Sequence, residues 1–397
     1  DQNALLGSAL GNNTVTLNAA GTASGAAAVE SYQLADGANT FTLGAAAQNV
    51  AGGTGDDVVH SGAVTVVSGT LNLGGGASNS QYQFLGAGTI NMTSGTYTAN
   101  VGKVNAANLN QSGGTFTMNL PSGNDGHYIG FAAGRSVSYT MSGSAIINAN
   151  SSTNTNTNSF LAIGRGAGNT AYSNTLNVTG AANLNVGTTA ARSGELQIAN
   201  NADSNGTLNV TSGTVLVSGT ANNKIYFFKA GSGAGYTANM TQSGGTVTAN
   251  GIQFGGTGGT YNAASSANLT LSGGVLYVGL QGITKGSGAN DLTTNIKLQG
   301  GTVGASDNWS SSLNMKLGTT GTTGGPTFQA ATSGTVSKNI TLSGILSDDT
   351  GATGTLTKSG AGTLTLGTAG ATATYASSGT VTINGGTLLV ASGTSFT

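Results

Sequence analysis

Residues 356–390 decide the fold of this chain, and they read LTKSGAGTLTLGTAGATATYASSGTVTINGGTLLV. Leu364 and Leu366 flank Thr365, and the same alternation returns in residues 381–383. A period of two sends the large apolar side chains to one side of an extended backbone and threonine to the other. The Ser-Gly and Gly-Gly pairs between the runs supply the positive φ that sharp bends need. We therefore interpret this stretch as one coil of a β-solenoid.

The same pattern of strand, glycine bend and second strand recurs through the chain. Looser copies lie at residues 66–73, 91–100, 111–119, 210–217, 242–250, 271–278 and 299–303. Their bends are roughly 30 residues apart, which is the length of one solenoid coil. A propeller would need four strands in each repeat and recurring tryptophans, whereas this chain has 1 Trp. An antiparallel sandwich would show a hairpin turn about every 8–12 residues and no recurring sequence motif. The sequence predicts an all-β chain forming a single rod-like β-solenoid domain.

Two segments, 356–366 and 379–390, resemble the autotransporter-associated β-strand repeat of bacterial passenger proteins and large secreted surface proteins. The resemblance implies a right-handed parallel β-helix outside the cell, with no chemistry attached and no functional residue to carry over. In autotransporters a membrane domain follows the passenger, and the chain shows none up to Thr397.

Composition limits the function classes. The chain has 397 residues with 69 Gly, 2 Pro, no Cys and 6% charged residues, whereas ordinary soluble domains carry about 25%. A net charge of −1 gives no electrostatic reason to expect nucleic acid or an anionic membrane as a partner. No apolar run is long enough to span a bilayer as a helix. The start at Asp1 fits the processed end of a mature secreted protein.

The repeat pattern is weaker near the start of the chain. Residues 14–17 and 40–43 read as short strands, and an alanine-rich run at 21–29 separates them. Solenoid ends expose unpaired strands that need a cap or a partner. We therefore expect an irregular cap or assembly segment over residues 1–50 and a solenoid of roughly 30-residue repeats over residues 51–397.

Two segments are candidate contact surfaces. Residues 148–159 read NANSSTNTNTNS and predict an exposed polar loop. Residues 225–228, between Lys224 and Lys229, form the densest aromatic patch. Consecutive apolar residues break the alternation there, so at least one ring is expected to face outward.

One segment matches a calcium motif. Residues 52–60 fit the nine-residue β-roll pattern G-G-x-G-x-D-x-U-x, in which Asp57 would be the ligand. That motif needs tandem copies, and the chain has one, with residues 37–40 a poor partner. A glycine-rich bend is the favoured reading, calcium at Asp57 stays open, and we predict no metal site and no cofactor.

The sequence gives little evidence for a catalytic site. The acid pairs at 56–57 and 348–349 are sequence neighbours, so in a strand each pair would point to opposite sides. His60 and His127 are the 2 histidines, and Asp125 lies close to the second in a segment that reads as a turn. Neither a nucleophile elbow nor a phosphate loop is present. We predict no catalytic residue and no enzyme, with a carbohydrate-active β-helix enzyme as the least favoured alternative.

Arg135 and Arg165 occur in similar glycine-rich settings. Adjacent coils could stack them on one face, where they would meet an acid of a neighbouring subunit. The favoured alternative is a pair of solvated surface arginines.

These patterns favour a non-enzymatic extracellular or cell-surface protein of bacteria. The repeat runs almost to Thr397 without an evident polar cap, so the chain itself is the expected partner, head to tail in a filament. The alternative is a passenger stalk or adhesin displayed from a bacterial outer membrane, with host or cell-surface glycans as partners. Filaments or discrete rods in the microscope would separate the two.

Overall fold

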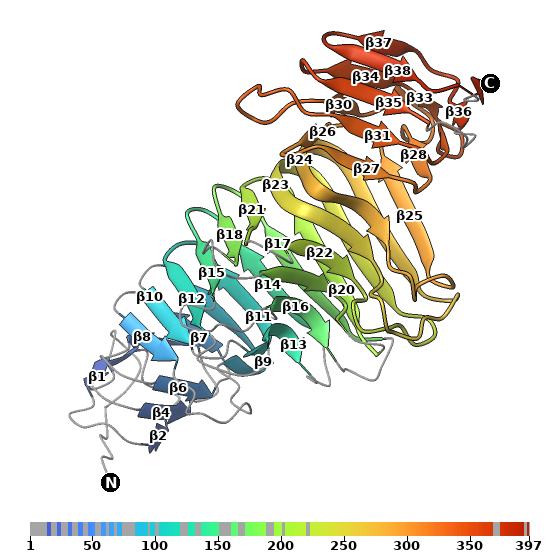
Figure 1. Cartoon of the computed structure of the whole chain (residues 1–397). Coiled ribbons are helices and arrows are strands. Elements are labelled where there is room, and N and C mark those ends of the chain that lie inside the picture. Colours follow the sequence, from blue (N-terminus) through green and yellow to red (C-terminus); the bar gives the residue numbers. More distant parts are fainter. Residues whose placement is uncertain are drawn as a thin grey trace.

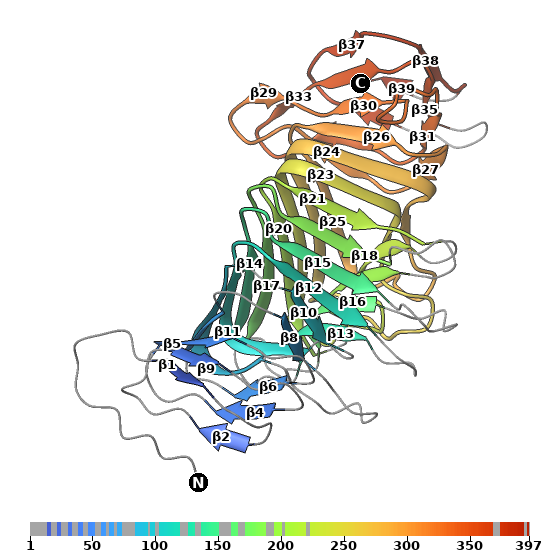
Figure 2. The ribbon, with the colours of Figure 1, turned by 90° about the vertical axis from the view of Figure 1, so that its left-hand side faces the viewer.

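The computed structural model is a β-solenoid in which parallel strands stack along one axis (Figure 1), so the predicted all-β solenoid is confirmed. Between residues 14 and 99 it describes the backbones of the strands, and side chains are described mostly from Asn91 onward. Between residues 103 and 396 it describes the whole chain except segments 120–125, 132–135, 151–159, 166–170, 188–193, 201–202, 220–222, 368–373 and 393–394. Within these described residues there is no helix. A second view shows the coils following one another along the axis (Figure 2).

Each full coil contributes strands to three faces, which we call A, B and C in chain order. Face A contains β1 (Thr14–Thr16), β3 (Ser31–Gln33), β5 (Ala47–Ala51), β7 (Ala63–Val66), β14 (Val137–Met141), β17 (Ser173–Val178), β20 (Asn205–Val210), β25 (Thr293–Leu298), β28 (Met315–Leu317), β32 (Leu346–Asp348), β36 (Thr374–Ala376) and β39 (Ser395–Phe396). Face B contains β8 (Thr70–Leu73), β10 (Thr96–Ala99), β12 (Thr115–Asn119), β15 (Ile146–Asn150), β18 (Asn183–Val186), β21 (Thr214–Val217), β26 (Thr302–Ala305), β30 (Thr327–Gln329), β34 (Leu356–Ser359) and β37 (Val381–Ile383).

Face C contains β2 (Thr22–Ser24), β4 (Asn39–Thr42), β6 (Asp57–His60), β13 (His127–Phe131), β16 (Phe160–Arg165), β19 (Glu195–Ile198) and β22 (Lys224–Phe227). A separate sheet continues it, made of β27 (Trp309–Ser311), β31 (Ile340–Leu342), β35 (Thr363–Leu366) and β38 (Thr387–Val390). Four longer strands bend across faces: β9 (Phe84–Met92), β11 (Lys103–Gln111), β23 (Thr237–Phe254) and β24 (Ser266–Lys285). The short strands β29 (Thr323–Gly324) and β33 (Thr353–Gly354) pair with each other.

The strand register places residues of the same or similar type next to each other in successive coils. Asparagine amides bond across coils from Asn177 to Thr140 and from Asn295 to Asn268, over sequence separations of 37 and 27 residues. In the first coils the steps are shorter, since Thr14 pairs with Ser31 and Ser31 with Asn49. Residues 14–51 thus add five short parallel strands to the same stack.

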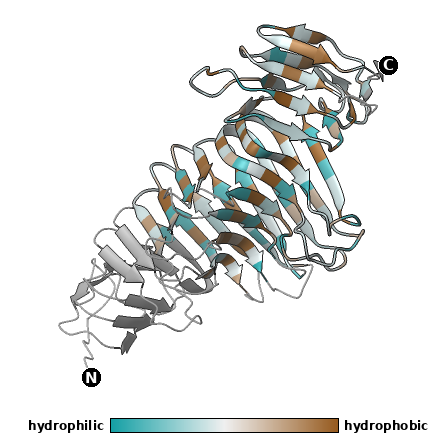
Figure 3. Cartoon of the chain, in the orientation of Figure 1, coloured by the Kyte–Doolittle hydropathy of each residue, from teal (hydrophilic) through white to brown (hydrophobic). Residues whose placement is uncertain are grey.

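The alternating pattern places the core inside the coils, and hydrophobic and polar residues alternate along many strands (Figure 3). Leu176, Leu208, Met240 and Leu269 share one register column and are all fully buried. Burying one such side chain contributes about 1.5–3 kcal/mol, so a column repeated through the stack dominates the stability.

The predicted loop at 148–159 begins later than expected. Strand β15 runs to Asn150 and pairs in register with β18, so the first three residues of that segment belong to face B. The remaining residues, 151–159, lie outside the described part of the chain. The alternation of Ile147 and Ala149, both buried, carries the strand into the asparagine-rich sequence.

The corner after face C uses a left-handed backbone in five successive coils. Its residues are Gly130, Gly164, Ala199, Phe228 and Gly255, with φ of 78°, 86°, 55°, 54° and 74°. Glycine adopts this conformation without strain, whereas a residue with a Cβ does so at a cost. A Cβ on Gly164 would also lie 2.5 Å from the carbonyl oxygen of Asn205.

We predict that Gly164→Ala lowers the free energy of unfolding by about 2–3 kcal/mol, because it adds both a backbone clash and left-handed strain. Ala199→Gly at the equivalent corner is the matched control. It should change the free energy by less than about 1 kcal/mol, because relief of strain offsets the lost buried methyl group. Urea unfolding measures both, and equal losses in the two variants would refute the argument.

Inward-pointing polar side chains close several corners. Gln242 Nε2 donates to the carbonyls of Gly244, Gly245 and Val275 at 3.3, 3.3 and 2.9 Å. Val275 belongs to the next coil. Buried carbonyls need such partners because no water reaches them.

At another corner, the charged side chain of Lys358 supplies the hydrogen-bond donors. It is fully buried, and its Nζ donates to the carbonyls of Ser359, Gly360 and Gly385 at 2.8, 2.8 and 2.9 Å. Gly385 lies in the following coil. Desolvation by burial lowers the pKa of Lys358, and the three carbonyls favour the ammonium form.

Lys358→Met is expected to lower the free energy of unfolding by about 2–4 kcal/mol, since carbonyls of two coils lose a charged donor. The control is Lys316→Met, which removes an exposed lysine that donates to Ser347 at 2.9 Å and should change stability by less than about 0.5 kcal/mol. Amide hydrogen exchange should locate the loss in residues 356–390. A loss spread evenly over the rod would count against the corner as its cause.

Candidate functional site

The calcium-like segment is partly described. Asp57 begins β6 and pairs with Asn39 at the start of β4, so the strands that follow the two glycine-containing segments are neighbours in the stack. Residues 52–56 and the side chain of Asp57 lie outside the described part. Among the residues that the structure describes, no group of three His, Asp or Glu side chains could hold a metal ion.

The two histidines lie on the same face but in different coils. His60 ends β6, and His127 begins β13. His127 is buried, with 1% of its surface exposed. Asp125 and the side chain of His60 are not described, so the suggested Asp125–His127 turn stays a prediction.

The carboxylates of Asp348 and Asp349 have different partners. Asp348 accepts hydrogen bonds from the hydroxyls of Ser377 and Ser378, both at 2.6 Å, and from the backbone N–H of Gly354 at 2.8 Å. Asp349 instead forms an ion pair of 2.8 Å with Lys297. Asp348 ends β32 and Asp349 follows it, and the two carboxylates bind different partners in different coils and do not converge on one point.

Hydrogen bonds control the acidity of Asp348. Burial by itself raises the pKa of this carboxyl group, but the hydrogen bonds from Ser377, Ser378 and Gly354 outweigh it and hold the pKa at about 2. The folded-state pKa is thus below the unfolded value of 3.8. The carboxylate stabilises the fold above that unfolded value, and this contribution is lost as the pH falls towards 2.

We predict that Asp348→Asn lowers the free energy of unfolding at pH 7, and that the difference from the parent protein shrinks between about pH 4 and pH 2. Ser378→Ala removes one donor and keeps the carboxylate, so it should give an intermediate loss. Unfolding curves recorded at several pH values test both variants. A deficit of Asp348→Asn that stays constant across this range would disprove the assignment.

The suggested stacking of Arg135 and Arg165 stays a prediction. The Cα partner of Arg165 in the preceding coil is Phe131, and Arg135 lies outside the described residues. The guanidinium carbon of Arg165 lies 4.9 Å from the ring centre of Tyr128 and 5.5 Å from that of Phe131. Arginine over aromatic faces is a favourable cation–π arrangement.

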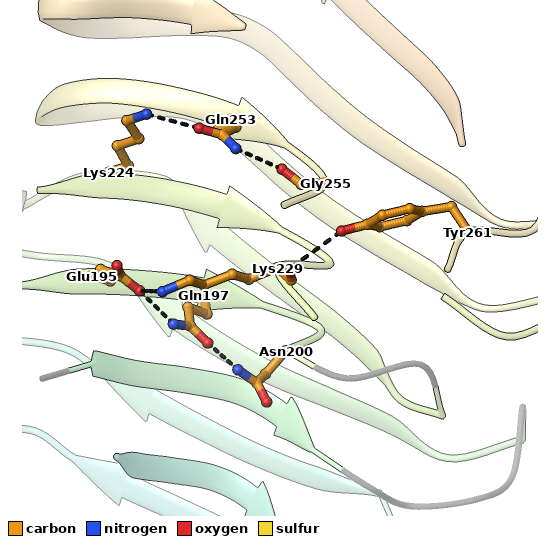
Figure 4. Close-up of polar contacts among 8 residues, drawn as sticks. All are labelled: Glu195, Gln197, Asn200, Lys224, Lys229, Gln253, Gly255 and Tyr261. Carbon is orange, nitrogen blue, oxygen red and sulfur yellow. Dashed lines mark hydrogen bonds and ion pairs between the residues drawn. The ribbon is translucent and has the colours of Figure 1, made fainter. Parts of the chain in front are cut away.

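Face C also carries a polar cluster that spacing did not predict. Glu195, with 1% of its side chain exposed, forms an ion pair with Lys229 from the next coil and accepts a hydrogen bond of 2.6 Å from Gln197 (Figure 4). Asn200 in turn donates to Gln197. A buried carboxylate needs such partners, because an uncompensated charge inside a protein is costly.

Tyr226 lies beside this ion pair. It alternates with the core residues Ile225 and Phe227 and so points away from the core axis, but only 7% of its surface is exposed, and the outward-facing ring expected from the sequence is therefore covered. The Nζ atoms of Lys224 and Lys229 lie 5.8 and 5.0 Å from its ring centre. Desolvation, reinforced by the charge of Glu195, raises the pKa of Tyr226 to about 12, so the hydroxyl stays neutral.

Lys224 extends the cluster to a third coil. Its Nζ donates to Gln253 Oε1 at 2.7 Å, and Gln253 Nε2 donates to the carbonyl of Gly255 at 2.9 Å (Figure 4). Burial lowers the pKa of Lys224, partly opposed by Glu195. We call Arg165, Glu195, Lys224, Tyr226, Lys229 and Gln253 the face-C stripe. The sequence signals for it were the aromatic patch between two lysines and the glycine-rich setting of Arg165.

The last coil is the second candidate site. Ile383 and Val390 are 54% and 40% exposed, although Lys358 and Leu366, at the same positions one coil earlier, are 0% and 2% exposed. These side chains therefore point towards the core axis and lack a coil on top of them. Leu389, 51% exposed, adds to this apolar end.

No helix among the described residues is long and apolar enough to cross a membrane. Comparison with known proteins found no matching family model, no matching curated protein and no matching solved structure. The resemblance of the last coils to the autotransporter-associated repeat therefore stays a prediction. What is established is the class, a β-solenoid repeat protein.

Proposed function

We propose that the protein is a non-enzymatic structural subunit that assembles end to end into a filament at the cell surface or in an extracellular matrix. The observation that carries the proposal is the apolar, unpaired last coil. Among the described strands, β37 pairs with β34 and β38 pairs with β35, each on one side only. Their free edges offer backbone donors and acceptors to a further parallel strand.

The opposite end supports a head-to-tail arrangement. Within the described strands, β1 pairs with β3 and β2 with β4, again on one side only. Among the described strands, one edge at each end of the stack is thus unpaired, and the two edges differ in sequence. Contacts between unlike surfaces produce an open filament when the rotation between neighbours does not close a ring, and stacking along the axis of the rod is such an arrangement. An extracellular or cell-surface location rests on the repeat resemblance and the neutral composition.

A passenger stalk or adhesin on a bacterial outer membrane is the second candidate. The face-C stripe favours it, because such a surface suits a ligand along the side of the rod and has no part in joining its ends. Discrete rods of constant length would support this candidate over the filament.

We expect filaments of the parent protein in negative-stain electron microscopy, and their loss in the double variant Ile383→Asp/Val390→Asp. Carboxylates at these positions would be desolvated by a stacked coil, which opposes assembly. Leu280→Asp is the control, because Leu280 is 67% exposed on β24, away from the ends. Filaments that persist in the double variant, or a parent protein that stays monomeric at all concentrations, would refute end-to-end assembly.

A further inference from the structure

We propose that Asn384, in the last coil, is a site of spontaneous covalent modification that loosens this coil from the one before it. The backbone nitrogen of Gly385 attacks the side-chain carbonyl carbon of Asn384, a C–N bond forms, and ammonia leaves. Water then opens the resulting succinimide ring to aspartate or, at the other ring carbonyl, to isoaspartate. Asparagine is a chemically labile residue, and a following glycine hinders ring closure least because it has no Cβ.

The chain contains three Asn-Gly pairs, at residues 205–206, 250–251 and 384–385. The first two lie inside strands β20 and β23. Gly206 and Gly251 each pair with a strand on both sides. A paired strand keeps its backbone extended, so the asparagine side chain reaches the following nitrogen only after the strand opens locally.

Asn205 is also held by its side chain. It is 7% exposed, and its Nδ2 donates to the carbonyl of Tyr172 at 2.9 Å. Its Oδ1 accepts a hydrogen bond of 2.7 Å from the backbone N–H of Thr237. Both ends of this amide are therefore fixed in directions set by the neighbouring coils.

Asn384 has none of these restraints. It is exposed and directly follows β37, and Gly385 lies in the bend before β38. In the described part of the chain, nothing bonds to the Asn384 amide or to the N–H of Gly385. A Cβ placed on Gly385 would lie 3.7 Å from the carbonyl oxygen of Gly360, so the bend also has room. The reacting atoms can therefore approach each other without the opening of a strand.

The product changes the corner that holds Lys358. The carbonyl of Gly385 accepts a hydrogen bond of 2.9 Å from Nζ of this fully buried lysine. Isoaspartate carries the main chain through its side chain and so inserts an extra methylene group before Gly385. That carbonyl then moves, and the buried ammonium group loses its acceptor from the last coil, which is costly.

One consequence rests on the end-to-end assembly proposed above. Asn384 adjoins Ile383, which is 54% exposed at the end of the stack. Either product places a carboxylate beside it, and a further coil stacked there would desolvate that charge. An end that has reacted therefore joins less readily. The modification and the loosening of the coil do not depend on assembly.

Peptide mapping of the full chain after ageing in warm, mildly alkaline buffer tests the chemistry. We expect Asn384 to be converted at least about tenfold faster than Asn205 and Asn250, because their strands must first open. Isoaspartate, detected with isoaspartyl methyltransferase, should form at residue 384, since it arises from the succinimide. Asn384→Gln, whose longer side chain closes a ring more slowly, should stop the reaction. Equal rates at the three pairs, or aspartate as the sole product, would overturn the proposal.

Amide hydrogen exchange tests the loosening. The aged parent protein should lose protection in residues 356–390, whereas aged Asn384→Gln should keep it. Asn384→Asp adds the carboxylate without the extra methylene group and should also keep it. Full protection in a parent protein that carries isoaspartate, or an equal loss in Asn384→Asp, would contradict the role assigned to the Gly385 carbonyl.

Negative-stain microscopy separates this proposal from the proposed function. Filaments of Asn384→Asp should be shorter than those of the parent protein, and equal lengths would remove the effect on joining. A parent protein that never forms filaments defeats end-to-end assembly, whereas the peptide map and the exchange data decide the modification independently of it.

Discussion

Parallel backbone hydrogen bonding between successive coils is the constraint on which the rest of this structure depends. Each strand bonds to the strand one coil before and one coil after it, so a residue's neighbours lie about 30 positions away in sequence. Once the register of one pair is set, as in Met240 with Leu269, the alternation of side chains sets the inner and outer positions of the whole strand. The core is therefore a set of columns of stacked side chains, and its stability depends on the contacts between each coil and its two neighbours.

Corners are where this arrangement is most demanding. The chain must turn between faces inside a tightly stacked rod, and carbonyl groups there turn away from their strand partners. Two kinds of residue resolve the problem. Glycine or another left-handed residue makes the turn after face C, and inward polar side chains such as Gln242 and Lys358 supply donors to the carbonyls. A lysine is unusual inside a core, yet its three N–H groups match three carbonyls from two coils.

Charge has a different distribution from apolar residues. The columns on faces A and B rely on neutral Thr and Asn side chains, whose amides can bond from coil to coil, as between Asn268 and Asn239 at 2.8 Å. On face C one described pair of charged residues, Glu195 and Lys229, bonds across coils, while Lys224 bonds to the amide of Gln253. Charge also occurs on and beside face A, where Lys297 in β25 pairs with Asp349, which follows β32.

The sequence by itself determined the fold class, because alternation with a period of two and a recurring glycine bend leave few architectures other than stacked parallel coils. It also predicted that one ring of residues 225–228 would face outward, but Tyr226, which lies outside the core cluster, is covered and only 7% exposed. Tertiary structure alone decided which polar side chains meet. The step between coils varies from 27 residues at Asn268–Asn295 to 37 at Thr140–Asn177, so sequence spacing does not identify partners one coil apart. For that reason Arg165 stacks on Tyr128 and Phe131, Glu195 finds Lys229, and Lys358 turns inward, none of which the linear pattern could specify.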